Sequence, residues 1–418
     1  MRAAMAAREW SRALGDRGTS VRLVRLLALA ALSACSGLGG ARHAHGRGAL
    51  AAPPGGLLPR QVPMFVSFGS DDNGYSGFPE SGSAGGVHFL TELFRGLRNP
   101  AGRGPASEFD GAPAHYSLYL NTEYVAPDEG AGYGGEVRED PALVLRSWKE
   151  AMDAGDEIGN HTHSHPRGTA FTADQWRAEM RLATEILARP FDLRGDRPRD
   201  DLRAGLGIDP REILGFRTPF LAYTDATLTA AQAEGFTYDC SLEEGGERGA
   251  DGRDYVWPYP LDRGSPGNPA VRPHPGLWEI PVYELIAPPD EACARYGVAP
   301  GLRGRLRARQ SDFEVAAGKI AGLDWNLWCE FDMSPQELLA TIEYSLDQRL
   351  AGNRAPLTIG LHSALYSDRW GAGPECANTP AQRRAALEEL VAYLQRKDEV
   401  RIVSARELLR WVQAAGSR

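Results

Sequence analysis

Short apolar runs alternate with amphipathic segments along most of the chain. Apolar residues that recur every three or four positions predict helices, and short continuous apolar runs predict buried strands. In the C-terminal part the pattern predicts helices over 335–350, 381–397 and 405–413, with strands over 357–361 and 400–403 between them. Strand–helix alternation at this scale is typical of a largely parallel sheet. The number of units predicts an α/β fold, a distorted (β/α) barrel of seven or eight strands.

The same alternation extends towards the N-terminus. It predicts strands over 62–68, 116–120, 157–159, 213–216, 237–238 and 278–285, and helices over 86–97, 141–154, 173–187 and 224–234. Two stretches, 243–276 and 288–332, are rich in Gly, Pro and charge and are predicted to be long decorated loops. No internal repeat or change of composition divides the chain, so we predict one catalytic domain over residues 61–413.

The N-terminal segment has the features of an export signal. Residues 1–25 are rich in arginine, residues 26–34 are apolar, and Cys35 follows. This order is typical of a secretory signal peptide. The ending Leu32-Ser33-Ala34-Cys35 resembles the lipobox of bacterial lipoproteins, whose signal is cut before a lipidated cysteine; the alternative is an ordinary signal with a chance cysteine. We predict a signal over 1–34, a flexible tether over 35–60 and a lipid-anchored protein of the bacterial cell envelope.

Composition excludes several classes of protein. The chain has 42% hydrophobic and 24% charged residues, as ordinary folded proteins do. A net charge of −9 without a basic stripe argues against nucleic-acid binding. No apolar run reaches the ~20 residues of a membrane-spanning helix, so we expect membrane attachment only through a lipid at Cys35.

Four cysteines remain after Cys35, an even number that suggests two disulfides in an exported chain. Sequence cannot choose among the three possible connectivities. None of them forms a Cys-x-x-Cys pair, which argues against a zinc–thiolate site. The four are Cys240, Cys293, Cys329 and Cys376.

Asp71 and Asp72 follow the first predicted strand. Two adjacent carboxylates repel each other, so a metal ion or an arginine is expected to compensate one of them. The alternative is a solvated turn, because Asp-Asn-Gly is good turn chemistry.

Three histidines stand within five positions, His161, His163 and His165, followed by Pro166. The i, i+4 spacing predicts that His161 and His165 lie on one side of a helical turn, where both imidazoles reach one cation. Pro166 ends that turn. His163 is expected to support the site or to face the substrate. A surface histidine cluster is the alternative.

Two further polar residues end predicted strands. Arg217 begins an Arg-Thr-Pro turn, and His362 follows the apolar strand 357–361. Each is a weak signal alone, because most arginines lie on the surface and a histidine in this position is often a core residue.

Taken in this order, the four features resemble the polysaccharide deacetylases of carbohydrate esterase family 4. The resemblance covers residues 61–413. Segments 93–100, 257–259, 277–282 and 353–357 also look similar to the animal-type chitin deacetylases of that family.

The resemblance implies a role for each matching residue. Asp72, His161 and His165 match the ligands of a divalent metal, zinc by default for this donor set. Other matches are the catalytic base Asp71, the arginine that holds the base ionised and oriented (Arg217), the general acid His362, the oxyanion donor (the Phe220 N–H) and a wall of the acetyl pocket (Trp257).

The sequence departs from the family pattern at a few positions. Gly69 and Ser70 precede the aspartates where Thr and Phe are usual, and Phe220 stands where Tyr is common. The carboxylate that tunes the catalytic histidine stays open, with three possibilities, namely Glu279, Glu284 and Asp324.

The resemblance implies metal-dependent hydrolysis of N-acetyl groups from a chitin-like polysaccharide of N-acetylglucosamine. The alternatives are a peptidoglycan N-acetylglucosamine deacetylase, an O-acetyl-xylan esterase and a non-catalytic glycan-binding relative. A metalloprotease is disfavoured because no Glu follows the first histidine as in His-Glu-x-x-His. Glycosidase chemistry is disfavoured because it needs two separated carboxylates rather than a metal site. The physiological metal and the oligomeric state stay open.

Overall fold

The computed structural model describes residues 48–102, 108–127, 129, 139–193, 203–247, 249–370 and 376–417. The unit described below begins at Leu50. The predicted signal peptide and Cys35 lie outside the described residues. Within the described ranges, no helix combines the length and the apolar character that crossing a membrane requires.

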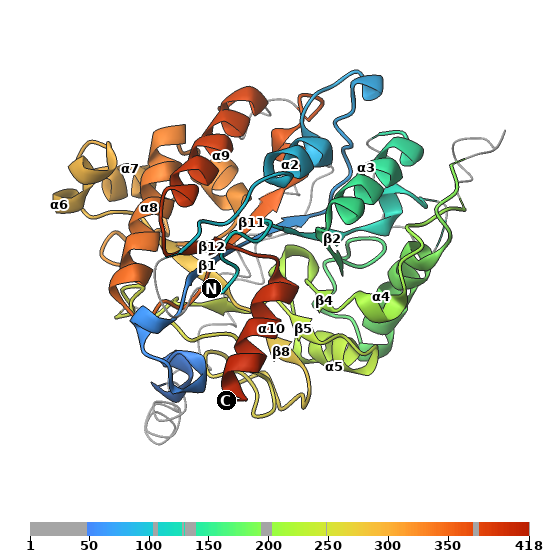
Figure 1. The fold of residues 1–418 in the computed structure, drawn as a ribbon, viewed down its shortest axis with the longest axis horizontal. Coiled ribbons are helices and arrows are strands. Elements are labelled where there is room, and N and C mark those ends of the chain that lie inside the picture. The colour runs from blue at the N-terminus through green and yellow to red at the C-terminus, as the bar shows by residue number, and fades with distance from the viewer. Residues whose placement is uncertain are drawn as a thin grey trace, which may run out of the picture. The chain divides into compact units, whose positions relative to one another are not determined.

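The centre of the unit is a curled, mostly parallel sheet (Figure 1). In spatial order its strands are β11 (Leu357–His362), β1 (Met64–Asp71), β2 (Ser117–Leu120), β3 (Glu157–Asn160), β4 (Gly215–Phe216), β5 (Tyr238–Asp239), β8 (Trp278–Glu279) and β7 (Tyr259–Pro260). β7 runs antiparallel to β8, and a further strand, β12 (Val400–Ile402), pairs with β1.

A smaller sheet lies beside β11. Its order is β10 (Lys319–Ala321), β9 (Val282–Ile286) and β6 (Glu243–Glu244). A bridge between Leu323 and Gly360 joins the segment after β10 to β11. The predicted α/β class and distorted barrel are confirmed.

Helices cover the strands, and most of them begin at residues that cap them. They are α2 (Gly86–Phe94), α3 (Pro141–Ala154), α4 (Ala173–Ala188), α5 (Asp225–Ala233), α6 (Asp290–Cys293), α7 (Leu302–Arg309), α8 (Pro335–Ala351), α9 (Pro380–Gln395) and α10 (Ala405–Gly416). Capping boxes begin α4, α8, α9 and α10, where a Ser or Thr accepts from the backbone three residues on. Each cap stabilises its helix by about 1 kcal/mol.

Strand register brings the chemistry-bearing residues to one edge of the main sheet. All eight residues of β1 are buried, as expected of a central strand covered on both faces. β1 pairs with β11 so that Asp71 lies opposite His362. β3 pairs with β4 so that Asn160 lies opposite Phe216, and the residues after them are His161 and Arg217. The carboxyl ends of these parallel strands therefore meet at one place.

The prediction of long loops is wrong for part of 288–332, which holds α7 and β10. In α7 only Leu302 and Leu306 are buried, and Arg305 and Arg309 pair with Glu337 of α8. Because α7 is held mainly by arginine contacts, its sequence shows little apolar periodicity, and this explains why the stretch was predicted to be a loop. In 243–276 the described residues, all but 248, form only the two-residue strands β6 and β7.

The described part of the predicted flexible tether is packed against the unit. The Leu50 carbonyl accepts from the Trp257 N–H at 2.9 Å, and the Asn353 amide donates to the Ala51 carbonyl. Leu50 and Leu57 both contact buried apolar clusters. The prediction of flexibility rested on the Gly- and Pro-rich composition. Composition does not reveal contacts with residues as distant in sequence as Trp257 and Asn353.

The prediction of two disulfides is wrong by one. Cys329 and Cys376 are bonded, whereas Cys240 and Cys293 are buried free thiols. Cys240 follows β5 inside the sheet and Cys293 ends α6, so each is enclosed by different elements.

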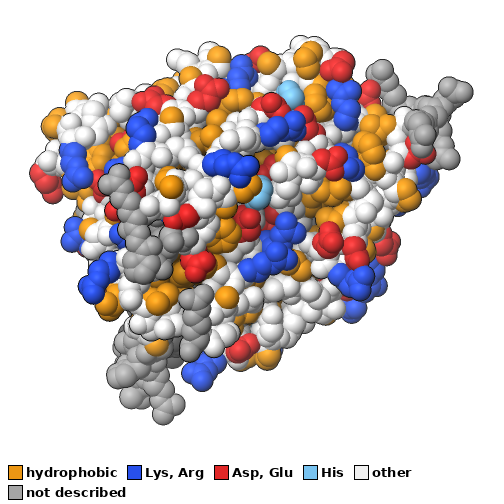
Figure 2. Space-filling view, in the orientation of Figure 1, with side chains coloured by type: hydrophobic (Ala, Val, Ile, Leu, Met, Phe, Trp, Pro, Cys, Tyr) orange, Lys and Arg blue, Asp and Glu red, His pale blue; other side chains and the backbone are white. Residues whose placement is uncertain are grey.

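Charge is spread rather than concentrated on the face seen in Figure 2. Acidic and basic side chains are interspersed there among apolar and polar ones. This mixture agrees with the modest net charge of −9.

Candidate active site

The two adjacent aspartates point to different partners. Asp71 is 3% exposed, and its Oδ1 lies 2.7 Å from Nη1 of Arg217. The guanidinium also donates to the Gly69 and Cys240 carbonyls and lies over the Tyr119 ring. Burial acts to lower the pKa of Arg217, but the Asp71 charge outweighs it and the pKa is raised well above its usual value. Arg217 is thus the charge that compensates Asp71.

Asp72 turns away from Asp71 because the backbone after β1 is left-handed. Asp72 and Asn73 have φ values of 64° and 68°, a conformation that Asp and Asn tolerate better than most residues. The Asn73 amide donates to the Ser70 and Tyr119 carbonyls at 2.9 and 3.2 Å. Asn73 is fully buried, so the segment is a braced turn rather than a solvated one.

The histidine segment after β3 is not a helical turn, which corrects the prediction. Thr162 and His165 have left-handed φ values of 72° and 51°. The Asn160 side chain accepts from the Thr162 N–H at 2.8 Å, and the Thr162 hydroxyl accepts from the His165 N–H at 3.1 Å. These side-chain bonds fold the loop so that the rings of His161 and His165 are 5.0 Å apart, centroid to centroid.

Glu179 of α4 holds this loop in place. Its carboxylate accepts from the Ser164 N–H at 2.9 Å, from the Ser164 hydroxyl at 2.8 Å and from the His163 N–H at 3.2 Å. The His163 ring is fully buried and bonds to the Thr122 hydroxyl and the Glu129 carbonyl. Of the two roles expected for His163, the structure favours support of the loop.

Asp72, His161 and His165 come together as a potential metal site. One ligand atom from each lies within 4.8 Å of the others. His165 Nε2 is 3.1 Å and His161 Nε2 is 3.6 Å from Asp72 Oδ1. His161 Nδ1 donates to the Arg217 carbonyl at 2.8 Å, which leaves Nε2 as the free donor atom of the ring.

The protonation state of His165 also suits a cation. Burial lowers the pKa of His165 to about 4, although the Asp72 charge opposes the shift. The imidazole is therefore neutral near pH 7, as a metal ligand must be. Two imidazoles and one carboxylate fit the three-ligand pattern of catalytic zinc sites, which keep a position open.

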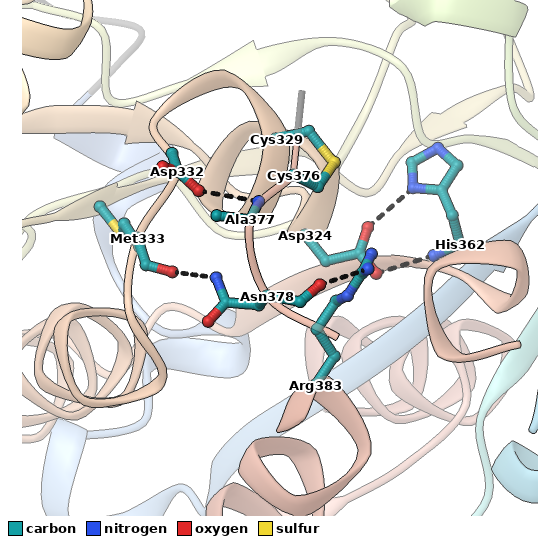
Figure 3. Close-up of a disulfide and its surroundings, with 9 residues drawn as sticks. All are labelled: Asp324, Cys329, Asp332, Met333, His362, Cys376, Ala377, Asn378 and Arg383. Carbon is teal, nitrogen blue, oxygen red and sulfur yellow. Dashed lines mark hydrogen bonds and ion pairs between the residues drawn. A yellow bond between two sulfur atoms is a disulfide. The ribbon is translucent and has the colours of Figure 1, made fainter. Parts of the chain in front are cut away.

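Asp324 is the carboxylate beside His362. Its Oδ1 lies 2.7 Å from His362 Nδ1, and its Oδ2 accepts from the His362 N–H at 2.9 Å (Figure 3). Burial acts to lower the pKa of His362, but the charge and hydrogen bond of Asp324, with help from Asp71 and Asp72, raise it to about 9. His362 is thus protonated near neutral pH, as a general acid requires.

The other two carboxylates left open by the sequence serve elsewhere. Glu279 accepts from the Leu242 N–H at 3.0 Å beside Asp239, and burial and the Asp239 charge raise its pKa well above the usual value. Glu284 is buried in β9.

Phe220 lies beside the metal triad. Its ring centroid is 4.4 Å from that of His165, and its φ is 59°. The preceding loop is fixed because the Ser241 hydroxyl accepts from the Thr218 N–H at 2.8 Å and donates to Asp239, also at 2.8 Å. The structure thus brings Phe220 to the other predicted site residues.

Trp257 is not brought to the site, which corrects its prediction as a wall of the acetyl pocket. It is 2% exposed, donates Nε1 to the Asn353 carbonyl and stacks on Trp411 of α10. Asn353 precedes β11, so these contacts lie at the end of the sheet opposite His362.

An aromatic residue that sequence reasoning missed, Trp325, lies near His362, and a second, Trp370, packs against it. The Trp325 ring is 6.3 Å from the His362 ring and 5.9 Å from Trp370, centroid to centroid. The available signal was the position of Trp325 directly after Asp324, inside a stretch predicted to be loop.

Comparisons with known proteins add a fold likeness. No family model matches the chain, and no curated protein matches it. Among solved structures, a putative polysaccharide deacetylase from Mycobacterium smegmatis is 16% identical, with a TM-score of 0.48 over 87% of this chain and 94% of that one. The Xyl-CE4 domain of a xylanase from the hindgut metagenome of Trinervitermes trinervoides is 10% identical, with a TM-score of 0.35 over 84% and 91%. Puue allantoinase is 16% identical, with a TM-score of 0.40 over 86% and 94%. The activities of these proteins differ and every TM-score is below 0.5, so the functional argument rests on this chain's own residues.

Proposed function

We propose that this protein is a metal-dependent hydrolase that removes N-acetyl groups from a polysaccharide containing N-acetylglucosamine. The observation that carries the proposal is the meeting of three units at one sheet edge. They are the Asp71–Arg217 pair, the triad of Asp72 with two histidines, and the Asp324–His362 pair.

These residues divide the reaction among them. A bound divalent cation supplies polarisation of the acetyl carbonyl and a lowered pKa of water. Asp71, oriented by Arg217, accepts the proton of the attacking water. The Phe220 N–H donates to the developing oxyanion, a contribution of about 3–4 kcal/mol for donors of this kind. His362 protonates the departing amine, which leaves a glucosamine unit and acetate.

The substrate is tested by measuring acetate release from chitin oligomers, peptidoglycan and acetyl-xylan side by side. Similarity of several segments to animal-type chitin deacetylases supports chitin-like oligomers, and we expect the highest kcat/KM on them. Preference for peptidoglycan would make the protein a cell-wall deacetylase. Preference for acetyl-xylan would make it an ester hydrolase built on the same residues.

A glycan-binding protein without activity is the alternative from another class. The presence of every predicted reacting group, namely Asp71, Asp72, His161, His165, Arg217 and His362, favours an enzyme. Binding of chitin oligomers without acetate release, by a metal-loaded protein, would support the alternative.

We also propose that residues 61–413 form the catalytic domain of an exported, lipid-anchored envelope protein. The sequence Leu32-Ser33-Ala34-Cys35 supports this. Because several acyl chains anchor firmly while one binds weakly, Cys35→Ser is expected to release the protein from the membrane fraction. Unchanged fractionation, with no lipid on the wild-type N-terminus by mass spectrometry, would contradict it.

A further inference from the structure

A disulfide joins the segment that follows Asp324 to the segment that leads into α9. Asp324 follows β10, and the single π-helical turn Asn326–Glu330 comes next. Cys329 in that turn forms the disulfide with Cys376, four residues before α9 begins (Figure 3). The only covalent cross-link among the described residues therefore lies five positions from the partner of His362.

Hydrogen bonds reinforce the cross-link on the same two segments. The Asp332 carboxylate accepts from the Ala377 N–H at 3.1 Å. The Asn378 amide donates to the Met333 carbonyl at 2.8 Å. Residues 376–378 and 329–333 are thus held together at three points, and the π-helical turn has little freedom to move away from the segment that leads into α9.

Arg383 of α9 connects this junction to Asp324 itself. Its side chain is fully buried and its Nη2 donates to the Asn378 carbonyl at 2.6 Å. The guanidinium also lies over the Trp370 ring and is close enough to Asp324 for their charges to interact. Figure 3 shows Arg383 reaching from α9 towards Asp324, on the side away from the His362 ring.

We propose that the Cys329–Cys376 disulfide and Arg383 form a brace that positions Asp324, and through it His362, for proton donation to the leaving group. The inference rests on the proposed function, because it assigns the brace to one step of that reaction. Cys329, Cys376, Asp324 and Arg383 are positioning residues, since none of them touches the reacting atoms.

The position of His362 determines whether it can protonate the leaving group, so a loss of the brace should lower the rate of that step. Proton transfer requires the acid within hydrogen-bond reach of the leaving nitrogen. A displacement of about 1 Å can cost roughly 10²-fold in rate. Asp324 bonds to both the ring and the backbone N–H of His362, so movement of Asp324 rotates or shifts the imidazole.

The test compares two acetyl substrates of one enzyme. An amine must be protonated as it leaves an N-acetylglucosamine oligomer, whereas the phenolate of an activated aryl acetate leaves without a proton. We expect the double variant Cys329→Ser/Cys376→Ser to lose about tenfold or more in kcat on the oligomer and to keep aryl acetate turnover within about twofold. Asp324→Asn serves as the reference and should show the same selective loss to a greater degree.

Two further variants keep the test decisive. Arg383→Gln leaves the disulfide in place and should give the same selective loss, so the proposal can be tested even if the double cysteine variant fails to fold. Cys293→Ala removes a buried free thiol in α6 and should leave the ratio of the two activities unchanged. Metal content is measured for every variant and should equal that of wild type.

Unchanged amide-to-ester ratios in both the double cysteine variant and Arg383→Gln would overturn the brace while leaving the proposed function intact. Equal losses on both substrates would also overturn it, since they would show a general structural role. Absence of acetate release from both substrates by the metal-loaded wild type would instead contradict the proposed function.

Discussion

Asp71 and Asp72 are neighbours in the chain but have separate partners. Asp71 accepts a hydrogen bond from Arg217, while Asp72 faces His161 and His165. Their separation follows from the left-handed backbone at Asp72, which turns one side chain inward and the other to the histidines. Substituting each aspartate should therefore impair a different property of the enzyme.

Asp71→Asn keeps the shape of the side chain, so metal should still bind while turnover falls by roughly 10²–10⁴-fold for lost acid–base catalysis. Asp72→Asn replaces a charged ligand by a neutral one, so metal affinity and activity should fall together. Elemental analysis paired with acetate release measures both. Equal loss of metal from the two variants would reverse the assignment, and near-normal turnover of Asp71→Asn would remove it as the base.

Asp324 sets the pH range in which His362 works as an acid. With the pKa of His362 raised from 6.5 to about 9, the proton is held through neutral pH and lost as the pH rises through 9. Asp324→Asn removes the charge that opposes burial, so the pKa should fall and the alkaline limb of the kcat profile should move to lower pH. A profile that keeps its alkaline limb in this variant would show that another group is the acid.

At the residue scale, the sequence predicted more of the metal site than of its surroundings. The spacing of His161 and His165 predicted that both could bind one cation, and the family resemblance assigned Asp72 as the third ligand. The carboxylate beside His362 could not be chosen, because Asp324 lies 38 positions away in the chain. The bridge between Leu323 and Gly360 of β11, which sequence does not reveal, brings the two together. Trp257 was misplaced because its role was carried over from the family resemblance, and similarity of a short segment does not tell at which end of the sheet a side chain packs.

At the element scale, the histidine loop depends on a carboxylate from a helix. Glu179 of α4 accepts three hydrogen bonds from Ser164 and His163. Because α4 begins with a capping box at Thr172, the position of Glu179 is set by a feature that the sequence shows. The left-handed turns at Thr162 and His165 could not be foreseen, since they depend on these side-chain bonds.

Glu179→Ala should lower metal affinity by roughly 10–100-fold, the usual effect of losing an outer support of a metal ligand. The fold should persist, because the apolar contacts of α4 are unchanged. Glu185→Ala, an exposed position on the same helix, is the matched control and should bind metal normally. Titration of the metal-free protein with Zn²⁺ gives both affinities. Equal affinities of the two variants would contradict the role of Glu179 in holding the histidine loop.

At the scale of the whole molecule, the alternation of apolar strands and amphipathic helices was enough to predict the barrel-like sheet. The central strands β1 and β11 are buried along nearly their whole length, which gives a clear apolar signal. The two-residue strands β6 and β7 gave no usable signal and lay in a stretch predicted to be loop, and the arginine-rich α7 gave none either. The packing of residues 50–61 was missed because it depends on Trp257 and Asn353, some 200 to 300 positions away.

Removal of residues 1–61 should therefore destabilise the unit relative to a chain that begins at residue 48. The loss includes apolar contacts of Leu50 and Leu57 and the hydrogen bonds to Trp257 and Asn353. Full burial of a leucine side chain contributes about 1.5–3 kcal/mol, and these two leucines are half-buried. A fall of a few degrees in the unfolding midpoint is therefore expected. Equal midpoints for the two chains would show that the segment contributes nothing to stability.

The central claim is that residues gathered at one edge of the sheet hydrolyse an acetamide, with the help of a cation held by Asp72, His161 and His165. The most direct measurement is acetate and free amine released from a chitin oligomer by the protein as purified, after chelation, and after addition of Zn²⁺ or another divalent ion. We predict equal amounts of acetate and amine, loss of both on chelation and recovery with the metal. Full activity in a demonstrably metal-free preparation would contradict the account.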